Sequence, residues 1–200
     1  MEHLCSNRNV SDSTRRAILD TAAAVLGRHS GASLADIATA AGVGRTTVHR
    51  YFATRTDLLH ALAMDSLERV EQAVTAARPD ADEPLAVIVE RVATALLPLA
   101  DEMHFLGAGA QVWDLPDLVE RWYDVGRPLE DTVRRAQRTG EVRPDLPVAW
   151  VVDLFVAAVF AASDGIADGR IARRDAVPLV VGTLLDGVST AAGTATRSGS

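Results

Sequence analysis

The chain has 200 residues, with 20 basic against 27 acidic side chains, a net charge of −7 and 48% hydrophobic residues. These values are typical of one or two soluble globular domains. The longest stretch without a charged residue, 103–113, is shorter than the ~18 to 20 apolar residues needed to span a bilayer. We therefore expect no transmembrane helix and no membrane partner.

Residues 1–10 lack the apolar segment of a signal peptide, and Cys5 has no second cysteine for an internal disulfide. The cytoplasm is the expected location. Residues 1–60 hold 7 Arg and 5 acidic residues, a net charge of +2, whereas 61–200 hold 13 Arg and 22 acidic residues, a net charge of −9. This asymmetry predicts that the two parts of the chain meet different partners.

Apolar residues follow helical spacing along nearly the whole chain, and no segment shows the sustained two-residue alternation of a half-buried strand. We predict an all-α protein whose first helix covers roughly 13–29. Ser33 is expected to cap a second helix, with Asp36 three residues on in a capping-box position, and this helix ends at Gly42.

After a turn at 42–44, a third short helix is expected at 45–52, with Val48 on its inward face. Two short helices joined by a glycine-containing turn predict a helix-turn-helix. A fourth helix begins after Thr54 or Thr56 and continues to the polar break at 78–83, long enough to leave the first domain.

Further helices are expected at 85–99, 103–110, 116–136, 148–162 and 176–192. Gly126 and Pro128 should kink or divide the one that starts at Pro116. The predicted organisation is a helix-turn-helix domain at 1–57, a larger helical domain at 58–193, and a disordered tail at 194–200.

Hydrogen-bond donors gather at the outer face of the third helix. Hydroxyls and guanidinium groups can bind DNA phosphates, and an outward arginine can pair with guanine in the major groove. The alternative is that these side chains only solvate a surface helix, but their place after a short helix and a glycine turn favours DNA. The predicted DNA-binding residues are Ser33, Arg45, Thr46, Thr47, His49, Arg50, Tyr51 and Arg55.

The segment of about 15–63 resembles the N-terminal domain of TetR-family transcriptional regulators. The resemblance rests on Ile37-Ala38, Ala41-Gly42-Val43, the run Thr47-Val48-His49-Arg50-Tyr51-Phe52, and Leu58-Leu59. It implies an all-helical homodimer that usually represses transcription and accepts a small inducer in its C-terminal domain. The rest of the chain resembles the family only in helix number and length.

The resemblance also implies roles for individual residues. Thr47 and Tyr51 match positions that typically hold phosphates, and Arg55 stands where the family usually has lysine. Gly44 stands where Ser or Thr commonly caps the recognition helix, so Thr46 would have to supply the missing hydroxyl. Arg45, His49 and Arg50 match variable positions that face the groove.

Aromatic and thioether side chains in the second half predict a ligand cavity, although ordinary core packing explains any one of them equally well. The predicted lining residues are Met103, Phe105, Trp113, Trp122, Tyr123 and Phe155. Residues 101–131 contain 8 acidic side chains against 2 Arg, a local charge of −6. Stacking and this negative field predict a mainly apolar, neutral or cationic inducer, although solvated helix faces explain the acids equally well.

The sequence predicts no metal site, no cofactor and no enzymatic activity. Asp101 and His104 lie three residues apart on an expected helix, but two metal ligands without a third are weak evidence. No nucleophile with a base partner and no glycine-rich phosphate loop is visible.

The last two long helices carry more apolar surface than one small core can absorb, which predicts that a second subunit covers them. Two such helix pairs across a two-fold axis would form a four-helix bundle. The alternative is that both helices form the core of their own domain. The residues assigned to the dimer interface are Val156, Phe160, Val180 and Leu184.

Together these features predict a ligand-responsive transcriptional repressor that binds a palindromic operator as a homodimer. An inducer that tilts the fourth helix would change the separation of the two reading domains. One alternative is an activator or architectural DNA-binding protein without an inducer. Another is a helical protein that binds small molecules and carries a vestigial DNA-binding domain.

Overall fold

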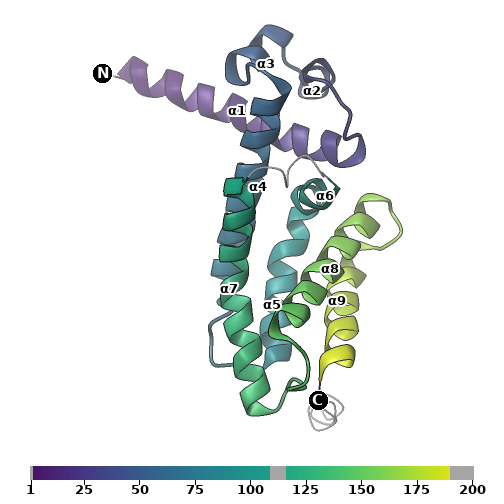
Figure 1. The fold of residues 1–200 in the computed structure, drawn as a ribbon. Coiled ribbons are helices and arrows are strands. Elements are labelled where there is room, and N and C mark those ends of the chain that lie inside the picture. Colours follow the sequence, from purple (N-terminus) through teal and green to yellow (C-terminus); the bar gives the residue numbers. More distant parts are fainter. Residues whose placement is uncertain (1, 109–115, 190–200) are drawn as a thin grey trace.

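The computed structural model describes residues 2–108 and 116–189, and these residues confirm the all-α class. Figure 1 shows α1, α2 and α3 together at one end, α4 running from them into the body beside α7, and α8 beside α9 on the opposite flank. The elements are α1 (Glu2–Arg28), α2 (Leu34–Ala40), α3 (Arg45–Tyr51), α4 (Arg55–Ala76), α5 (Leu85–Leu96), the 3-10 turn η1 (Leu97–Leu99), α6 (Ala100–Ala108), α7 (Pro116–Thr139), α8 (Val148–Ala167) and α9 (Arg173–Val188).

The group α1–α3 with the start of α4 forms a head around its own apolar core. Ile18, Ile37, Val48 and Leu58 come from the four helices and are completely buried. Removing such side chains from water stabilises a fold by about 1.5–3 kcal/mol each. This burial fixes α2 and α3 to α1 and α4, since helices of seven residues are not stable alone.

Two capping boxes set where α2 and α4 begin. The Ser33 hydroxyl accepts from the Asp36 backbone N–H, while the Asp36 carboxylate accepts from the Ser33 backbone N–H at 2.8 Å. The same reciprocal pair joins Thr54 and Asp57 at α4, so Thr54 is the cap. Gly42 follows α2 with a φ of +67°, a left-handed conformation that glycine adopts without strain.

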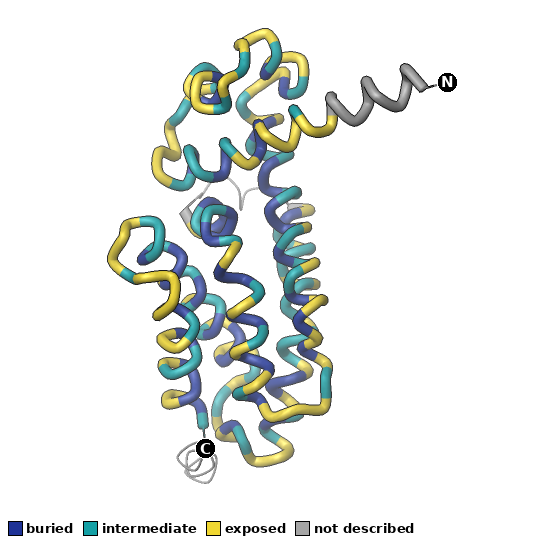
Figure 2. Tube along the Cα trace, turned by 180° about the vertical axis from the view of Figure 1, so that it is seen from behind, coloured by how far each residue is buried: buried dark blue, intermediate teal, exposed yellow. Residues whose placement is uncertain are grey.

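The larger domain is built from α4 to α9, and the burial of its helices is seen along the tube in Figure 2. The predicted division of the helix after Pro116 does not occur, because α7 is one helix of 24 residues with Pro128 inside it. The Thr132 hydroxyl lies 3.0 Å from the Pro128 carbonyl and also reaches the Pro79 carbonyl. Contacts of α7 with α4, α5 and α8 support its continuous path.

Helix α8 is long and apolar enough, by length and composition alone, to cross a membrane. The sequence-based expectation did not anticipate this, because Asp153 and Asp164 interrupt the apolar run. In the fold, α8 packs against α6, α7 and α9 and buries Val151, Phe155 and Val159. These residues belong to the core of the larger domain, whereas other apolar residues of α8, among them Trp150, are exposed.

Several helix boundaries differ from the expected ones. Helix α1 begins at Glu2, well before residue 13, and α6 (Ala100–Ala108) begins before residue 103, while 109–110 of the expected helix lie outside the described residues. Helix α8 continues to Ala167, and α9 runs from Arg173 to Val188 instead of 176–192. The predicted tail, 194–200, lies outside the described residues.

Candidate DNA-binding surface and ligand cavity

Helix α3 presents polar side chains outward because a single apolar residue anchors it. Val48 is completely buried, and Phe52 just after the helix is 3% exposed. Arg45, Thr46, His49 and Arg50 are exposed on the other side of the helix. At its start, Gly44 has extended backbone and no side-chain cap, so the first backbone N–H groups remain available to a phosphate.

The exposed side chains at the end of α3 contact one another. The Arg50 guanidinium lies 5.0 Å from the centre of the Tyr51 ring and donates to the Tyr51 hydroxyl at 3.3 Å. His49 Nδ1 lies 3.4 Å from the Ala53 carbonyl oxygen. Arg50 and Tyr51 thus form one hydrogen-bonding unit that can bind a base edge and a neighbouring phosphate.

Ser33 and Arg55 hold the loop between α1 and α2. The Ser33 hydroxyl donates to the Asp36 carboxylate at 2.7 Å, and the pKa of Asp36 is lowered by the Ser33 backbone N–H, then by that hydroxyl, with a further contribution from the charge of Arg45. The Arg55 guanidinium donates to the Ala32 carbonyl at 3.0 Å and to the Ser30 carbonyl. Both predicted DNA-binding side chains therefore also have structural roles within the head.

Sequence reasoning missed one basic side chain beside α3. The exposed Arg15 of α1 places its guanidinium 5.7 Å from the centre of the Phe52 ring, at the end of α3. Arg15 lies one turn before the buried Ile18 and therefore on the same side of α1, where the helical pattern favours a core residue, and the sequence could not show which helix it would face.

A cavity of about 270 Å³ lies between α4, α6, α7 and α8. Four of the predicted ligand-binding residues, Met103, Trp122, Tyr123 and Phe155, line it. Phe105 is 3% exposed and is not part of the wall, so the expectation for it is wrong for this cavity. Trp113 lies outside the described residues.

The cavity wall combines aromatic faces with carboxylates. Trp122 stacks on Phe160 with ring centres 5.8 Å apart and ring planes 15° apart. Glu130 accepts from Arg134 at 2.5 Å, whereas the exposed Asp153 has no hydrogen bond or ion pair within the described part of the chain. Glu130 is one of the acidic residues counted at 101–131, whereas Asp153 was missed by sequence reasoning, because only its packing across the helices shows that it borders the cavity.

Two of the four residues assigned to the dimer interface are buried in their own protomer, and the other two, Val156 and Phe160, are partly exposed. Val180 and Leu184 are 2% exposed, so they cannot present a surface to a second subunit, and the expectation for them is wrong. Val156 lines the cavity, and Phe160 packs on Trp122. In helices this apolar, the hydrophobic pattern does not separate the inward face from the outward one.

His104 of α6 binds a residue other than Asp101. Its Nδ1 pairs with the Asp164 carboxylate of α8, and its ring lies against Gly27 of α1. Among the described residues no group of three or more His, Cys, Asp and Glu side chains is placed to hold a metal ion.

Comparisons with known proteins identify relatives that cover most of the chain. A family model described as bacterial regulatory proteins, tetR family, matches residues 18–62. The HTH-type transcriptional repressor LfrR of Mycolicibacterium smegmatis is 37% identical over 177 residues, which cover 88% of this chain and 91% of that protein. The HTH-type transcriptional regulator NfxB of Pseudomonas aeruginosa is 27% identical over 164 residues, covering 79% of this chain and 85% of that protein.

A crystal structure of the TetR-like regulator LfrR from Mycobacterium smegmatis in complex with proflavine matches with a TM-score of 0.73 at 34% identity, covering 88% of this chain and 98% of that one. A regulator from Marinobacter aquaeolei shares the fold with a TM-score of 0.71 at 19% identity, covering 91% of this chain and 98% of that one. The head, the helical body and these relatives agree, and the chain belongs to the tetR family of bacterial regulatory proteins.

Proposed function

We propose that this protein is a transcriptional repressor that binds a palindromic operator as a homodimer and is released by a flat aromatic cation. The observation that carries the DNA-binding role is the exposed donor set of α3, held outward by the buried Val48. Arg50 is the candidate for base recognition, and Thr47 and Tyr51 are candidates for phosphate binding. The repressor role is supported by the similarity to LfrR, which is named a repressor.

The proposed ligand class follows from the wall of the cavity. Trp122 and Tyr123 offer aromatic faces for stacking, and Asp153 and Glu130 offer negative charge. A structure of the relative LfrR contains proflavine, which is a flat aromatic cation at neutral pH. A cavity of about 270 Å³ with an apolar wall and two carboxylates suits a molecule of this kind.

The proposed dimer surface consists of the exposed residues of α8 and α9. Trp150 and Leu179 are large apolar side chains that are 57% and 50% exposed. Ala157 and Ala161 on α8 and Thr183 on α9 are also exposed, and small residues allow close approach of helices across a two-fold axis. This surface replaces the buried Val180 and Leu184 of the sequence-based assignment.

The DNA-binding role is tested by mapping protected DNA in the chromosomal neighbourhood of the gene and measuring affinity by fluorescence anisotropy over a range of salt concentrations. Arg50→Ala should relax base preference at one position, by about 1–3 kcal/mol if it contacts guanine. Tyr51→Phe should weaken all sequences alike, because it removes a phosphate hydrogen bond. Wild-type affinity in the double variant would refute this assignment.

The ligand class is tested by titrating proflavine into the protein–operator complex and into free protein. Asp153→Asn should weaken proflavine binding by up to about fivefold, equivalent to roughly 1 kcal/mol for a solvent-exposed charge pair. The affinity for a neutral flat aromatic molecule should be the same in Asp153→Asn as in wild type. Glu120→Gln removes an exposed carboxylate of α7 that does not line the cavity and is the matched control. Release by anionic metabolites alone would contradict the proposed ligand class.

A further inference from the structure

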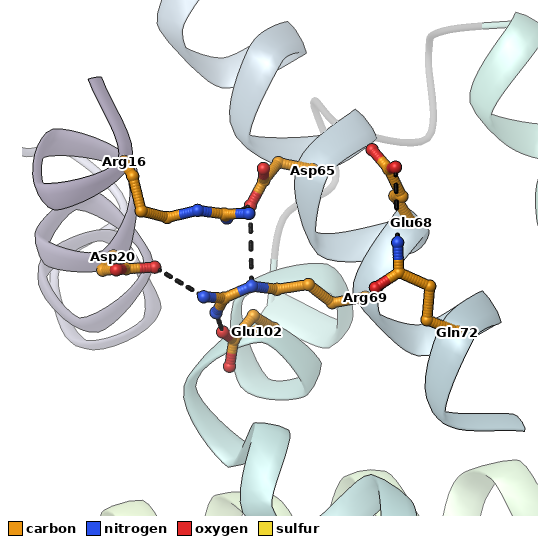
Figure 3. Close-up of polar contacts among 7 residues, drawn as sticks. All are labelled: Arg16, Asp20, Asp65, Glu68, Arg69, Gln72 and Glu102. Carbon is orange, nitrogen blue, oxygen red and sulfur yellow. Dashed lines mark hydrogen bonds and ion pairs between the residues drawn. The ribbon is translucent and has the colours of Figure 1, made fainter. Parts of the chain in front are cut away.

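A cluster of charged side chains joins the head to the body. Its members are Arg16 and Asp20 of α1, Asp65 and Arg69 of α4, and Glu102 of α6 (Figure 3). We refer to these five residues as the Arg69 cluster. It contains two arginines and three carboxylates and so has a net charge of −1.

Arg69 is the centre of this cluster because its guanidinium reaches all three carboxylates. It binds Asp20 at 2.9 Å, lies 3.8 Å from Asp65 and pairs with Glu102. Arg16 closes the cluster by pairing with Asp65 at 2.5 Å. Burial alone lowers the pKa of Arg69, but the charges of Glu102, Asp20 and Asp65 outweigh this effect and raise it.

Glu102 is the buried member, at 8% exposure. Separating a buried carboxylate from its cationic partner leaves an uncompensated charge in a poorly solvated place, which is strongly unfavourable. The pair of Glu102 and Arg69 therefore resists separation, and a displacement of α6 is expected to move the partners of Arg69 with it. Asp20 is one of those partners and belongs to the head.

The residue after Glu102 borders the ligand cavity. Met103 is 1% exposed and lines the cavity wall. The next residue, His104, pairs with Asp164 of α8 and lies against Gly27 of α1. Of three successive residues of α6, Glu102 thus belongs to the Arg69 cluster, Met103 lines the cavity, and His104 touches both α1 and α8.

We propose that the Arg69 cluster positions the head relative to the body and carries the effect of ligand binding from Met103 through Glu102 to α1. This inference rests on the proposed function. It assigns the coupling to Arg69, Glu102 and Asp20 as positioning residues that touch neither DNA nor ligand. Ligand binding that displaces Met103 strains the Glu102–Arg69–Asp20 connection and reorients α1 together with the helix-turn-helix packed on it.

The test compares operator affinity with and without saturating proflavine, and proflavine affinity with and without operator. Thermodynamic linkage requires both ratios to give one coupling factor, typically about 5- to 150-fold. Glu102→Gln and Asp20→Asn retain side-chain size and remove one charge each. Both variants should bind operator alone and proflavine alone within about threefold of wild type, while the coupling factor falls at least threefold.

Glu71→Gln is the matched control. Glu71 lies on α4, two residues from Arg69, and accepts from Arg121 of α7 at 2.6 Å, within the body. It should retain the wild-type coupling factor. Unchanged coupling in both cluster variants, or an equal loss in Glu71→Gln, would overturn the inference.

A second measurement needs neither operator nor ligand and so separates this inference from the proposed function. Amide hydrogen exchange should be faster in α1 and at the start of α4 in Asp20→Asn and Glu102→Gln than in wild type or Glu71→Gln. If amide exchange is faster in the cluster variants as expected, but proflavine does not release the wild-type protein from the operator, only the proposed ligand response is refuted. Wild-type exchange in both cluster variants would refute the positioning role of the cluster.

Discussion

Gly27→Ala should destabilise the protein by forcing apart α1 and α6. A Cβ atom at Gly27 would lie 2.7 Å from the Cδ2 atom of His104. Ordinary carbon–carbon contacts are about 3.5–4.0 Å, so one helix or the imidazole would have to shift by roughly 1 Å. The imidazole cannot turn away without losing its pair with Asp164.

The expected net cost is about 1–2 kcal/mol. Overpacking of this kind costs about 1–3 kcal/mol, and the better helix propensity of alanine offsets it by less than about 1 kcal/mol in the last turn of α1. Gly126→Ala is the comparison, because nothing lies within 4 Å of its added Cβ in the middle of α7. That variant should gain up to about 1 kcal/mol.

Urea unfolding at one fixed protein concentration measures both variants. In a His104→Ala background the cost of Gly27→Ala should largely disappear, since the clashing ring is gone. A Gly27→Ala protein that equals wild type in stability, or that loses the same stability in both backgrounds, would refute the reasoning.

Four further expectations follow from burial and capping. Thr54→Ala should cost about 1 kcal/mol in urea unfolding by removing the cap of α4. Leu58→Ala should cost about 2–5 kcal/mol, because the side chain is completely buried in the head, and circular dichroism should show earlier melting. Asp36 has a lowered pKa in the folded state, so its stabilising contribution is complete above its ordinary pKa of 3.8 and is lost as the pH falls through the lowered value. Asp36→Asn should therefore weaken the dependence of stability on acid pH in titration monitored by circular dichroism. Leu179→Glu should convert the proposed dimer to monomer in sedimentation equilibrium and weaken operator binding, whereas a dimer that persists in this variant would exclude α9 from the interface.

The three-dimensional arrangement of the Arg69 cluster could not be read from the chain. Arg16, Asp65 and Glu102 lie far apart in sequence, and each is an ordinary charged residue on a helix. Their meeting depends on how α1 and α6 cross α4. The same applies to Asp153, which borders a cavity only because α7 and α8 pack together.

Local chemistry determined the helical class, the head and the starts of α2, α3 and α4. The Ser33–Asp36 box, the left-handed Gly42 and the inward Val48 act within a few residues, so sequence spacing is enough to predict them. The same local patterns led to the TetR resemblance and to the outward donors of α3.

Tertiary packing decided which faces of the apolar helices are inside. Val180 and Leu184 are core residues, and Leu179 beside them is exposed, although nothing in the local sequence separates the three. Packing also kept α7 continuous through Pro128 and engaged Arg55 with the loop before α2. These outcomes depend on contacts between segments that are distant in the chain. Such tertiary contacts can override the conformational preference of a single residue.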